Sequence, residues 1–217
     1  KELLAADCQL LMPMRWRIAD AVDELMQATE DQMRALRLLR GQSRLLVRGG
    51  AGSGKTLLAL NLAREQANAG KTVLLTCFNR YLAQQLAEAL ADRPGVTVLT
   101  FHDLTAHWAR QAGLAYVVPK DAAAQSAFYR EGCAELLMQA AETLGPAYDS
   151  ILVDEGADFP ATWWLALEAL GRPGFRWHCF YDLNQRLYWH GEADWQPPFA
   201  ADVMELDINL RQSKEKR

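Results

Sequence analysis

The chain has 217 residues, of which 50% are apolar and 23% are charged, and its 23 Lys and Arg against 27 Asp and Glu give a net charge of −4. This length suits one domain with a substantial core, and the composition excludes disordered, collagen-like and coiled-coil proteins. The negative charge argues against a uniformly basic surface that wraps nucleic acid, but it allows a local cationic track.

The cysteines and the N-terminus indicate the compartment. Cys8, Cys77, Cys133 and Cys179 lie far apart without zinc-ligand spacing, so neither a zinc site nor a disulfide framework is predicted. No apolar run reaches the ~18–20 residues of a membrane span, and acids stand where a signal peptide would be apolar. We therefore expect a reduced, cytoplasmic protein with no membrane partner. Because the chain begins at Lys1 rather than Met, we also expect a fragment of a longer protein.

Strands and helices are predicted to alternate along the chain. Residues 14–40 show a helical period interrupted near Thr29, which predicts two helices. The further segments, in chain order, are a strand at 45–47, a helix at 57–69, a strand at 72–76, a helix at 82–90, a strand at 96–100, a helix at 104–111, and strands at 150–154, 177–181 and 203–206. This alternation predicts an α/β fold in which helices cover both faces of a mostly parallel sheet.

Residues 113–148 interrupt the alternation. They contain no convincing strand but a strong helical stretch over 122–144. We interpret 113–148 as a helical insertion in a single domain that covers 1–217. Pro197 and Pro198 predict a surface loop.

A glycine-rich segment follows the predicted strand at 45–47. It fits the pattern GxxxxGKT and consists of Gly49, Gly50, Ala51, Gly52, Ser53, Gly54, Lys55 and Thr56. A strand before the pattern and a helix after it are the context that a phosphate-binding loop requires. Glycines let such a loop turn its N–H groups toward phosphate, while Lys55 neutralises the β- and γ-phosphates and Thr56 holds Mg²⁺. Mg²⁺ and ATP are the predicted cofactors; the alternative is a glycine-rich turn with a chance match.

Two acids end the predicted strand at 150–154. In a domain that hydrolyses ATP, Asp154 would hold Mg²⁺ through water and Glu155 would orient and deprotonate the attacking water. Carboxylates at the carboxyl end of a parallel strand face the ligand crevice of an open sheet. The alternative is a pair of acids that ends a strand in solvent, and the phosphate loop upstream favours the catalytic interpretation.

The order of the motifs resembles the superfamily 1 DNA helicases of the UvrD/Rep type. The resemblance is carried by GGAGSGKT at 49–56, LLTCFNRYLAQQL at 74–86, TFHDL at 100–104, VDEGADF at 153–159, FYDLNQRLY at 180–188 and LDINLRQS at 206–213. It spans about three quarters of the chain and implies a RecA-like P-loop NTPase domain. The TCFNRYLA and VDEGADF segments look most like the branch in which a nuclease-related domain precedes the helicase.

The resemblance implies further nucleotide contacts. Gln32 matches the glutamine that reads the adenine edge, which would make ATP preferred over GTP. Gln185 and Arg211 match groups that approach the γ-phosphate, so the implied catalytic set is Lys55, Glu155, Gln185 and Arg211.

The resemblance also implies a single-stranded DNA track. The matching residues are Asn79, Arg80, Thr100, Phe101 and His102, with Trp189 as the candidate stacking tryptophan. A motor needs aromatic faces that stack on any base and polar groups that hold phosphates.

Each placement has a structural alternative. Phe101 and Phe78 are equally well interpreted as core aromatics at strand ends, and His102 as a structural histidine. Asp182 and Gln185 fit a turn, and Arg211 fits a surface charge. Three further tryptophans in apolar context are predicted to pack in the core, namely Trp163, Trp164 and Trp177.

Three positions depart from the family pattern. Ala157 replaces an amide that helps to link the nucleotide site to the DNA site, and Leu210 replaces an aromatic that stacks on adenine. Near the track, the usual aromatic is displaced, with Cys77 followed by Phe78. The chain also ends soon after Arg211, before the second motor domain of the family.

These observations predict the first motor domain of an ATP-dependent DNA helicase or translocase that acts on single-stranded DNA. The implied partners are a second motor domain and, upstream, a nuclease-related domain. Alone, the fragment is expected to bind Mg-ATP, to hydrolyse it very slowly and not to unwind duplex. An alternative is a non-catalytic, nucleotide-dependent binding module in which Ala157 reflects lost turnover. A small-molecule kinase would leave TFHDL and LDINLRQS unexplained.

Overall fold

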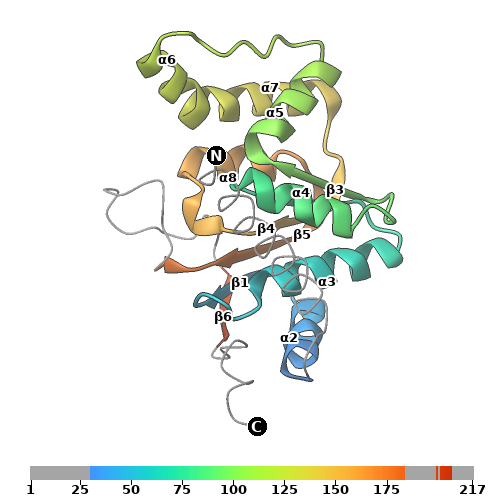
Figure 1. Ribbon diagram of the computed structural model, residues 1–217. Helices are drawn as coiled ribbons and strands as arrows, with labels where there is room; N and C mark the ends of the chain where they lie inside the picture. The colour runs from blue at the N-terminus through green and yellow to red at the C-terminus, as the bar shows by residue number, and fades with distance from the viewer. Residues whose placement is uncertain (1–29, 184–198, 200, 207–217) are drawn as a thin grey trace, which may run out of the picture.

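The computed structural model describes residues 30–183, 199 and 201–206. In this part of the chain, six strands form one sheet in the order β3-β2-β4-β5-β1-β6, and every neighbouring pair is parallel (Figure 1). The strands are β1 (Arg44–Gly49), β2 (Val73–Cys77), β3 (Val96–Thr100), β4 (Tyr148–Val153), β5 (Gly171–Tyr181) and β6 (Asp202–Leu206). All six were predicted, and the expected α/β fold of the RecA-like type is confirmed.

Helices cover both faces of the sheet, and each face has its own apolar core. On one face pack α2 (Glu30–Gly41), α3 (Lys55–Asn68) and α4 (Arg80–Ala89), and on the other α5 (Phe101–Gln111), α7 (Cys133–Leu144) and α8 (Ala161–Glu168). Strand β2 is buried along its whole length, with Leu74 in one core and Leu75 in the other. This burial on both faces explains why the strand is a continuous apolar run.

The carboxyl ends of the parallel strands share one edge of the sheet, and the predicted site residues follow these ends. The phosphate loop follows β1, Asn79 lies just after β2, Phe101 follows β3, Asp154 follows β4 and Asp182 follows β5. Strand β5 lies between β1 and β4, so the loop and the acid pair are separated by one strand. Ligands of open α/β sheets bind at this edge.

The predicted insertion at 113–148 contains three helical pieces. They are α6 (Ala122–Ala127), the π-helical turn η1 (Phe128–Gly132) and α7, and β4 begins at Tyr148. Helix α7 packs against α5 and α8 (Figure 1). Its fully buried Leu137 and Ala140 belong to the larger core, so this helix is continuous with the packing of the sheet domain.

Two carbonyl groups of the π-helical turn accept hydrogen bonds from neighbouring helices. The Arg130 carbonyl accepts from Trp163 Nε1 at 2.9 Å and from Thr162 Oγ1 at 3.3 Å. The Tyr129 carbonyl lies 3.2 Å from Nε2 of His102. These hydrogen bonds therefore connect the helical segment to α8 and to the start of α5.

Two elements differ from the sequence-based expectation. Strand β5 begins at Gly171, whereas the prediction began at 177; its early part contains Pro173 and Gly174, and its register with β4 shifts between Tyr148 and Ser150. Helix α8 was not predicted.

Within the described residues, no helix combines the length and apolar character needed to cross a membrane.

Candidate nucleotide and nucleic-acid site

The phosphate loop has the backbone shape that its glycines predict. Gly52 and Gly54 have φ of 75° and 89°, a region in which a side chain is strained and glycine is not. At Gly49, a Cβ would overlap the hydroxyl of Ser53. Helix α3 begins directly after Gly54, at Lys55, so its N-terminus faces the loop.

The side chain of Lys55 lies across the loop. Its Nζ donates hydrogen bonds of 2.8 Å to the carbonyls of Gly49 and Gly50 and lies 4.0 Å from Oδ2 of Asp182. Burial lowers the pKa of Lys55, while the charges of Asp182 and Asp154 oppose this shift. A bound triphosphate would add negative charge beside Nζ and would favour the ammonium form.

Ser53 supplies an observation that points to a ligand in the loop. Its side chain is buried, and within the part of the chain that the structure describes its Oγ has no hydrogen-bond partner. A buried polar atom without a partner is costly unless a ligand or water satisfies it. The loop amides, Lys55 and this hydroxyl together fit a phosphate group.

Asp154 connects the acid pair to the loop. It is 1% exposed, and its Oδ2 accepts a 2.6 Å hydrogen bond from Oγ1 of Thr56. Its Oδ1 accepts from the N–H of Glu155 at 3.0 Å. Burial raises the pKa of Asp154, partly offset by the Thr56 hydrogen bond. A hydroxyl and a carboxylate this close are the hard oxygen donors that Mg²⁺ prefers when phosphates supply other ligands, so the residues fit the predicted metal.

Glu155 sits in an unusual conformation. Its φ is 56°, and its Oε2 accepts a 3.1 Å hydrogen bond from the backbone N–H of Asn79. Burial, with the charge of Asp154 as the next contribution, raises the pKa of Glu155 to about 7. A carboxylate with a pKa near the working pH is suited to accept a proton from water.

Asn79 and Arg80 form the start of α4. Asn79 is its N-cap, and its side chain accepts hydrogen bonds from the N–H groups of Tyr81 and Leu82 at 2.9 and 3.1 Å. The side chain of Arg80 is 87% exposed and lies 3.9 Å from Asp103. Arg80 is therefore accessible to a phosphate backbone.

Thr100 and Asp103 form the cap of α5. The Thr100 hydroxyl donates to Oδ2 of Asp103 at 2.8 Å and accepts from the N–H of Asp103 at 3.2 Å. Thr100 is 5% exposed, so its hydroxyl already serves the helix.

The aromatic residues of the predicted track lie in a packed cluster. Phe101 is fully buried, and its ring stacks on Trp163 with centroids 4.0 Å apart. Phe78 stacks on the same indole at 5.9 Å. Phe101 therefore fits the alternative interpretation, a core aromatic at the end of a strand, because its buried ring has no exposed face on which a base could stack. His102 is half-buried, burial lowers its pKa, and its Nε2–H donates to the Tyr129 carbonyl.

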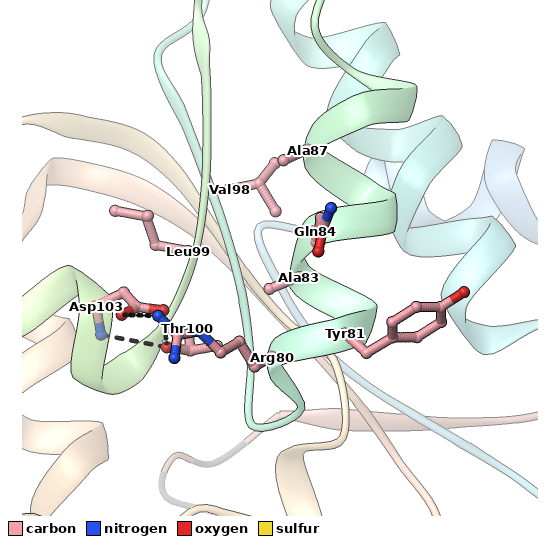
Figure 2. A pocket seen from close by; sticks show the side chains of 9 residues that line it. All are labelled: Arg80, Tyr81, Ala83, Gln84, Ala87, Val98, Leu99, Thr100 and Asp103. Atoms are coloured by element: carbon pink, nitrogen blue, oxygen red, sulfur yellow. Dashed lines mark hydrogen bonds and ion pairs between the residues drawn. The ribbon is translucent and has the colours of Figure 1, made fainter.

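A surface pocket of about 540 Å³ lies between α4 and the edge strand β3. It is lined by Arg80, Tyr81, Ala83, Gln84, Ala87, Val98, Leu99, Thr100 and Asp103. Figure 2 shows Arg80 pointing toward Thr100 and Asp103, whereas the ring of Tyr81 points away from β3. The pocket adjoins Arg80 and Thr100, two predicted track residues.

Several predicted residues cannot be placed in the site. Gln185, Trp189 and Arg211 lie outside the described residues, and Gln32 is described only as part of the backbone of α2. Conversely, the sequence did not indicate that Asp182 faces Lys55. Its place directly after a buried strand was the available signal, and its neighbours instead suggested a turn.

Solved structures that resemble the chain include three structures of Pif1 helicases. A structure described as showing DNA unwinding at forked duplex DNA by two coordinating Pif1 helicases is 19% identical, with a TM-score of 0.44, and the match covers 77% of this chain and 37% of that one. Bacteroides Pif1 bound to ssDNA is 18% identical, with a TM-score of 0.49 and coverage of 88% and 44%. Bacteroides Pif1 with ADP-AlF3 and ssDNA is 18% identical, with a TM-score of 0.49 and coverage of 87% and 44%. The match spans less than half the length of each of these proteins.

A comparison with curated proteins found no match. A protein-family model described as an AAA domain matches residues 32–188. This range covers more than half of the chain and includes the phosphate loop, the acid pair and the start of α4. The chain therefore belongs to this AAA domain family.

Proposed function

We propose that the chain is the first motor domain of an ATP-dependent DNA helicase or translocase of the UvrD/Rep type that acts on single-stranded DNA. The observation that carries the nucleotide part is the 2.6 Å hydrogen bond between Thr56 and Asp154. It brings the phosphate loop and the acid pair together at one edge of the sheet, which is the arrangement that Mg-ATP hydrolysis requires.

The residues have separate roles in this proposal. The loop amides and Ser53 bind the phosphates, and Lys55 exchanges the carbonyls of Gly49 and Gly50 for phosphate oxygens. Thr56 and Asp154 would hold Mg²⁺, which supplies charge neutralisation to the phosphates. Glu155 accepts the proton of the attacking water.

The remaining catalytic groups come from other segments. Gln185 and Arg211 approach the γ-phosphate, and Gln32 selects adenine, as the family resemblance implies. A second motor domain completes the cleft, and closing and reopening of that cleft moves the protein along one strand. A nuclease-related domain upstream is the further proposed partner, because the TCFNRYLA and VDEGADF segments resemble the helicases that carry such a domain.

The nucleic-acid part is supported by position and exposure. Thr100 ends β3, and Asn79, Arg80 and His102 follow strand ends at the same edge, which carries the phosphate loop. Arg80 contributes an exposed guanidinium for phosphate contacts, and Trp189 is the proposed stacking residue. Phe101 is buried under these residues and packs against Trp163, so its role in this proposal is structural.

A second candidate is a nucleotide-dependent binding module without turnover. Ala157 is the observation that favours it, because this buried methyl group stands where the family has a coupling amide.

ATP hydrolysis by the full-length protein, with and without oligothymidylate, separates the two candidates. A motor should hydrolyse ATP and should do so at least about tenfold faster with the oligonucleotide. Tight ATP binding without hydrolysis in either condition would instead support the binding module. Absence of ATP binding would contradict both.

A further inference from the structure

Helix α2 is held at its C-terminal end by an arginine of a strand that is distant in the sequence. Arg176 lies in β5, and its Nη1 donates hydrogen bonds to the carbonyl of Arg40 at 2.8 Å and to the carbonyl of Gln42 at 3.2 Å. The last carbonyl groups of a helix have no partner within the helix and carry partial negative charge. The guanidinium therefore satisfies two carbonyl groups and stabilises this end of α2.

Two further contacts fix the same end of α2. The side chain of Arg40 forms an ion pair with Glu65 of α3. The backbone N–H of Trp177, in β5, donates a 2.7 Å hydrogen bond to the carbonyl of Ser43, which lies in the short connection from α2 to β1. The C-terminal end of α2 is thus attached both to an interior strand of the sheet and to the helix that follows the phosphate loop.

A second side chain of β5 lies under this helix end. His178 is on the same face of the strand as Arg176, because successive side chains of a strand alternate between its two faces. The ring is fully buried. Burial lowers the pKa of His178, and the nearby carbonyls of Leu39 and Gln42 oppose this shift. Strand β5 therefore directs two nitrogen-bearing side chains toward one end of α2.

The other described contacts of α2 are mainly apolar. Ala35, Leu36 and Leu39 are buried in the core that α2 shares with α3, whereas Arg37 and Leu38 are exposed. Apolar burial is non-directional, so this strip keeps the helix against α3 but permits it to tilt. Hydrogen bonds depend strongly on angle. The two hydrogen bonds of Arg176 therefore restrict the direction in which α2 points.

We propose that Arg176 is a positioning residue for recognition of the nucleotide base: by holding the C-terminal end of α2, it aligns Gln32, in the first turn of the same helix, with the adenine edge. This inference rests on the proposed function, in which Gln32 selects adenine. About two helical turns, or ~12 Å, separate Gln32 from Arg40. A tilt of α2 that follows loss of the Arg176 contacts therefore displaces Gln32 from the base.

Loss of Arg176 should reduce base selectivity and leave phosphate binding intact. Arg176→Met keeps an apolar stem but has no donor, so only a fraction of the molecules hold α2 in the competent direction, and the apparent affinity falls by that fraction. In the full-length protein, the Kd for ATP should rise about three- to tenfold. The Kd values for GTP and for inorganic tripolyphosphate should change less than about twofold. Titration calorimetry measures all three, and equal weakening of the three ligands would show a purely structural role and overturn the inference.

Arg172→Met is the matched control. Arg172 lies earlier in β5, and its Nη1 also donates two hydrogen bonds, to Oγ1 of Thr72 at 3.0 Å and to Oδ1 of Asp149 at 3.1 Å. The variant thus removes the same charge and the same number of donated bonds from the same strand, but it leaves the contacts of α2 in place. It should retain the wild-type preference for ATP over GTP. An equal loss of preference in the two arginine variants would contradict the proposal.

Gln32→Ala distinguishes failure of this inference from failure of the proposed function. If Arg176 acts through Gln32, adding Arg176→Met to Gln32→Ala should cause no further loss of ATP affinity. An additive loss in the double variant, or a wild-type preference for ATP in Arg176→Met alone, would overturn the inference and leave the role of Gln32 intact. A wild-type protein that binds ATP and GTP equally, or a Gln32→Ala variant that keeps the preference, would refute the proposed role of Gln32, and the inference with it.

Discussion

Thr56 and Asp154 lie within hydrogen-bond distance, 2.6 Å apart, although 98 residues separate them in the chain. One residue is in the first turn of α3, and the other follows β4. Their contact crosses the carboxyl end of β5, the strand between β1 and β4. The site is thus assembled by the strand order, before any ligand enters.

Thr56→Ala should weaken Mg²⁺-dependent nucleotide binding selectively. Removal of the hydroxyl deletes one oxygen donor and leaves the buried Asp154 without this hydrogen bond, so the affinity for Mg-ATP should fall at least about tenfold. The affinity for ATP in the presence of a chelator should change little. Titration calorimetry in both conditions measures the difference. Thr56→Ser retains the hydroxyl and should behave like wild type; an equal loss of affinity in both variants would argue against a metal role.

Lys55→Ala should abolish nucleotide binding. The ammonium group is the charged donor beside the loop carbonyls, and phosphate binding without it loses a charge-assisted hydrogen bond. Calorimetry with ATP should show no measurable heat of binding. Lys120→Ala removes the same charge from an exposed loop position and should leave binding intact. Unaltered affinity of Lys55→Ala would refute the phosphate-loop assignment.

Glu155→Gln should stabilise the ligand-free protein at alkaline pH. The pKa of Glu155 is raised to about 7 from 4.5, so the unfolded state releases its proton at lower pH than the folded state. The stability that this group contributes is present below pH 4.5 and is lost as the pH rises through 7. The glutamine variant should exceed wild type by about 1–3 kcal/mol at pH 8 and match it near pH 4. Urea unfolding at both values tests this, and an equal difference at both would contradict the assignment.

His178 should make folding sensitive to mild acid. This residue is fully buried in β5, and burial, with the charge of Arg176 as a smaller contribution, lowers the pKa of His178 from 6.5 to about 4. The unfolded chain therefore takes up a proton between these values while the folded chain does not. Stability should fall by about 3 kcal/mol as the pH drops from 6.5 to 4.

A variant comparison isolates the contribution of His178. His178→Leu replaces the ring with an apolar side chain and should flatten this part of the stability profile. The exposed His107 provides the control, and His107→Gln should retain the wild-type slope. Identical slopes for all three proteins would show that other groups cause the acid sensitivity.

Local pattern was sufficient to predict the existence of the six strands and the phosphate loop. Each buried strand is a short run of apolar and β-branched residues, and β3 was predicted with its observed bounds, Val96–Thr100. The loop is recognisable because its glycines are required by its own backbone angles. Helix α8 was missed because its apolar residues, including Trp163 and Trp164, occur on nearly every side, so the helical period is weak.

Contacts between distant segments could not be predicted from the same patterns. The Glu155–Asn79 hydrogen bond depends on β2 lying beside β4, which the order of elements along the chain does not specify. Phe101 illustrates a second limit. An aromatic at the end of a strand can face a ligand or the core, and only the position of Trp163 beneath it decides between them. The start of β5 was not predicted, because Pro173 and Gly174 are atypical of a strand interior; proline and glycine in a strand mark an irregularity such as the register shift observed here.

The π-helical turn at Phe128–Gly132 limits how the protein can be trimmed. Because its Arg130 carbonyl is the acceptor for the buried indole of Trp163, excision of 113–148 would strand that N–H inside the aromatic cluster. Phe78 and Phe101 stack on the same indole, so the packing of these two rings would become less ordered as well. A protein shortened by removal of these helices would therefore lose packing contacts directly under the carboxyl-terminal edge of the sheet, where the phosphate loop and the acid pair lie.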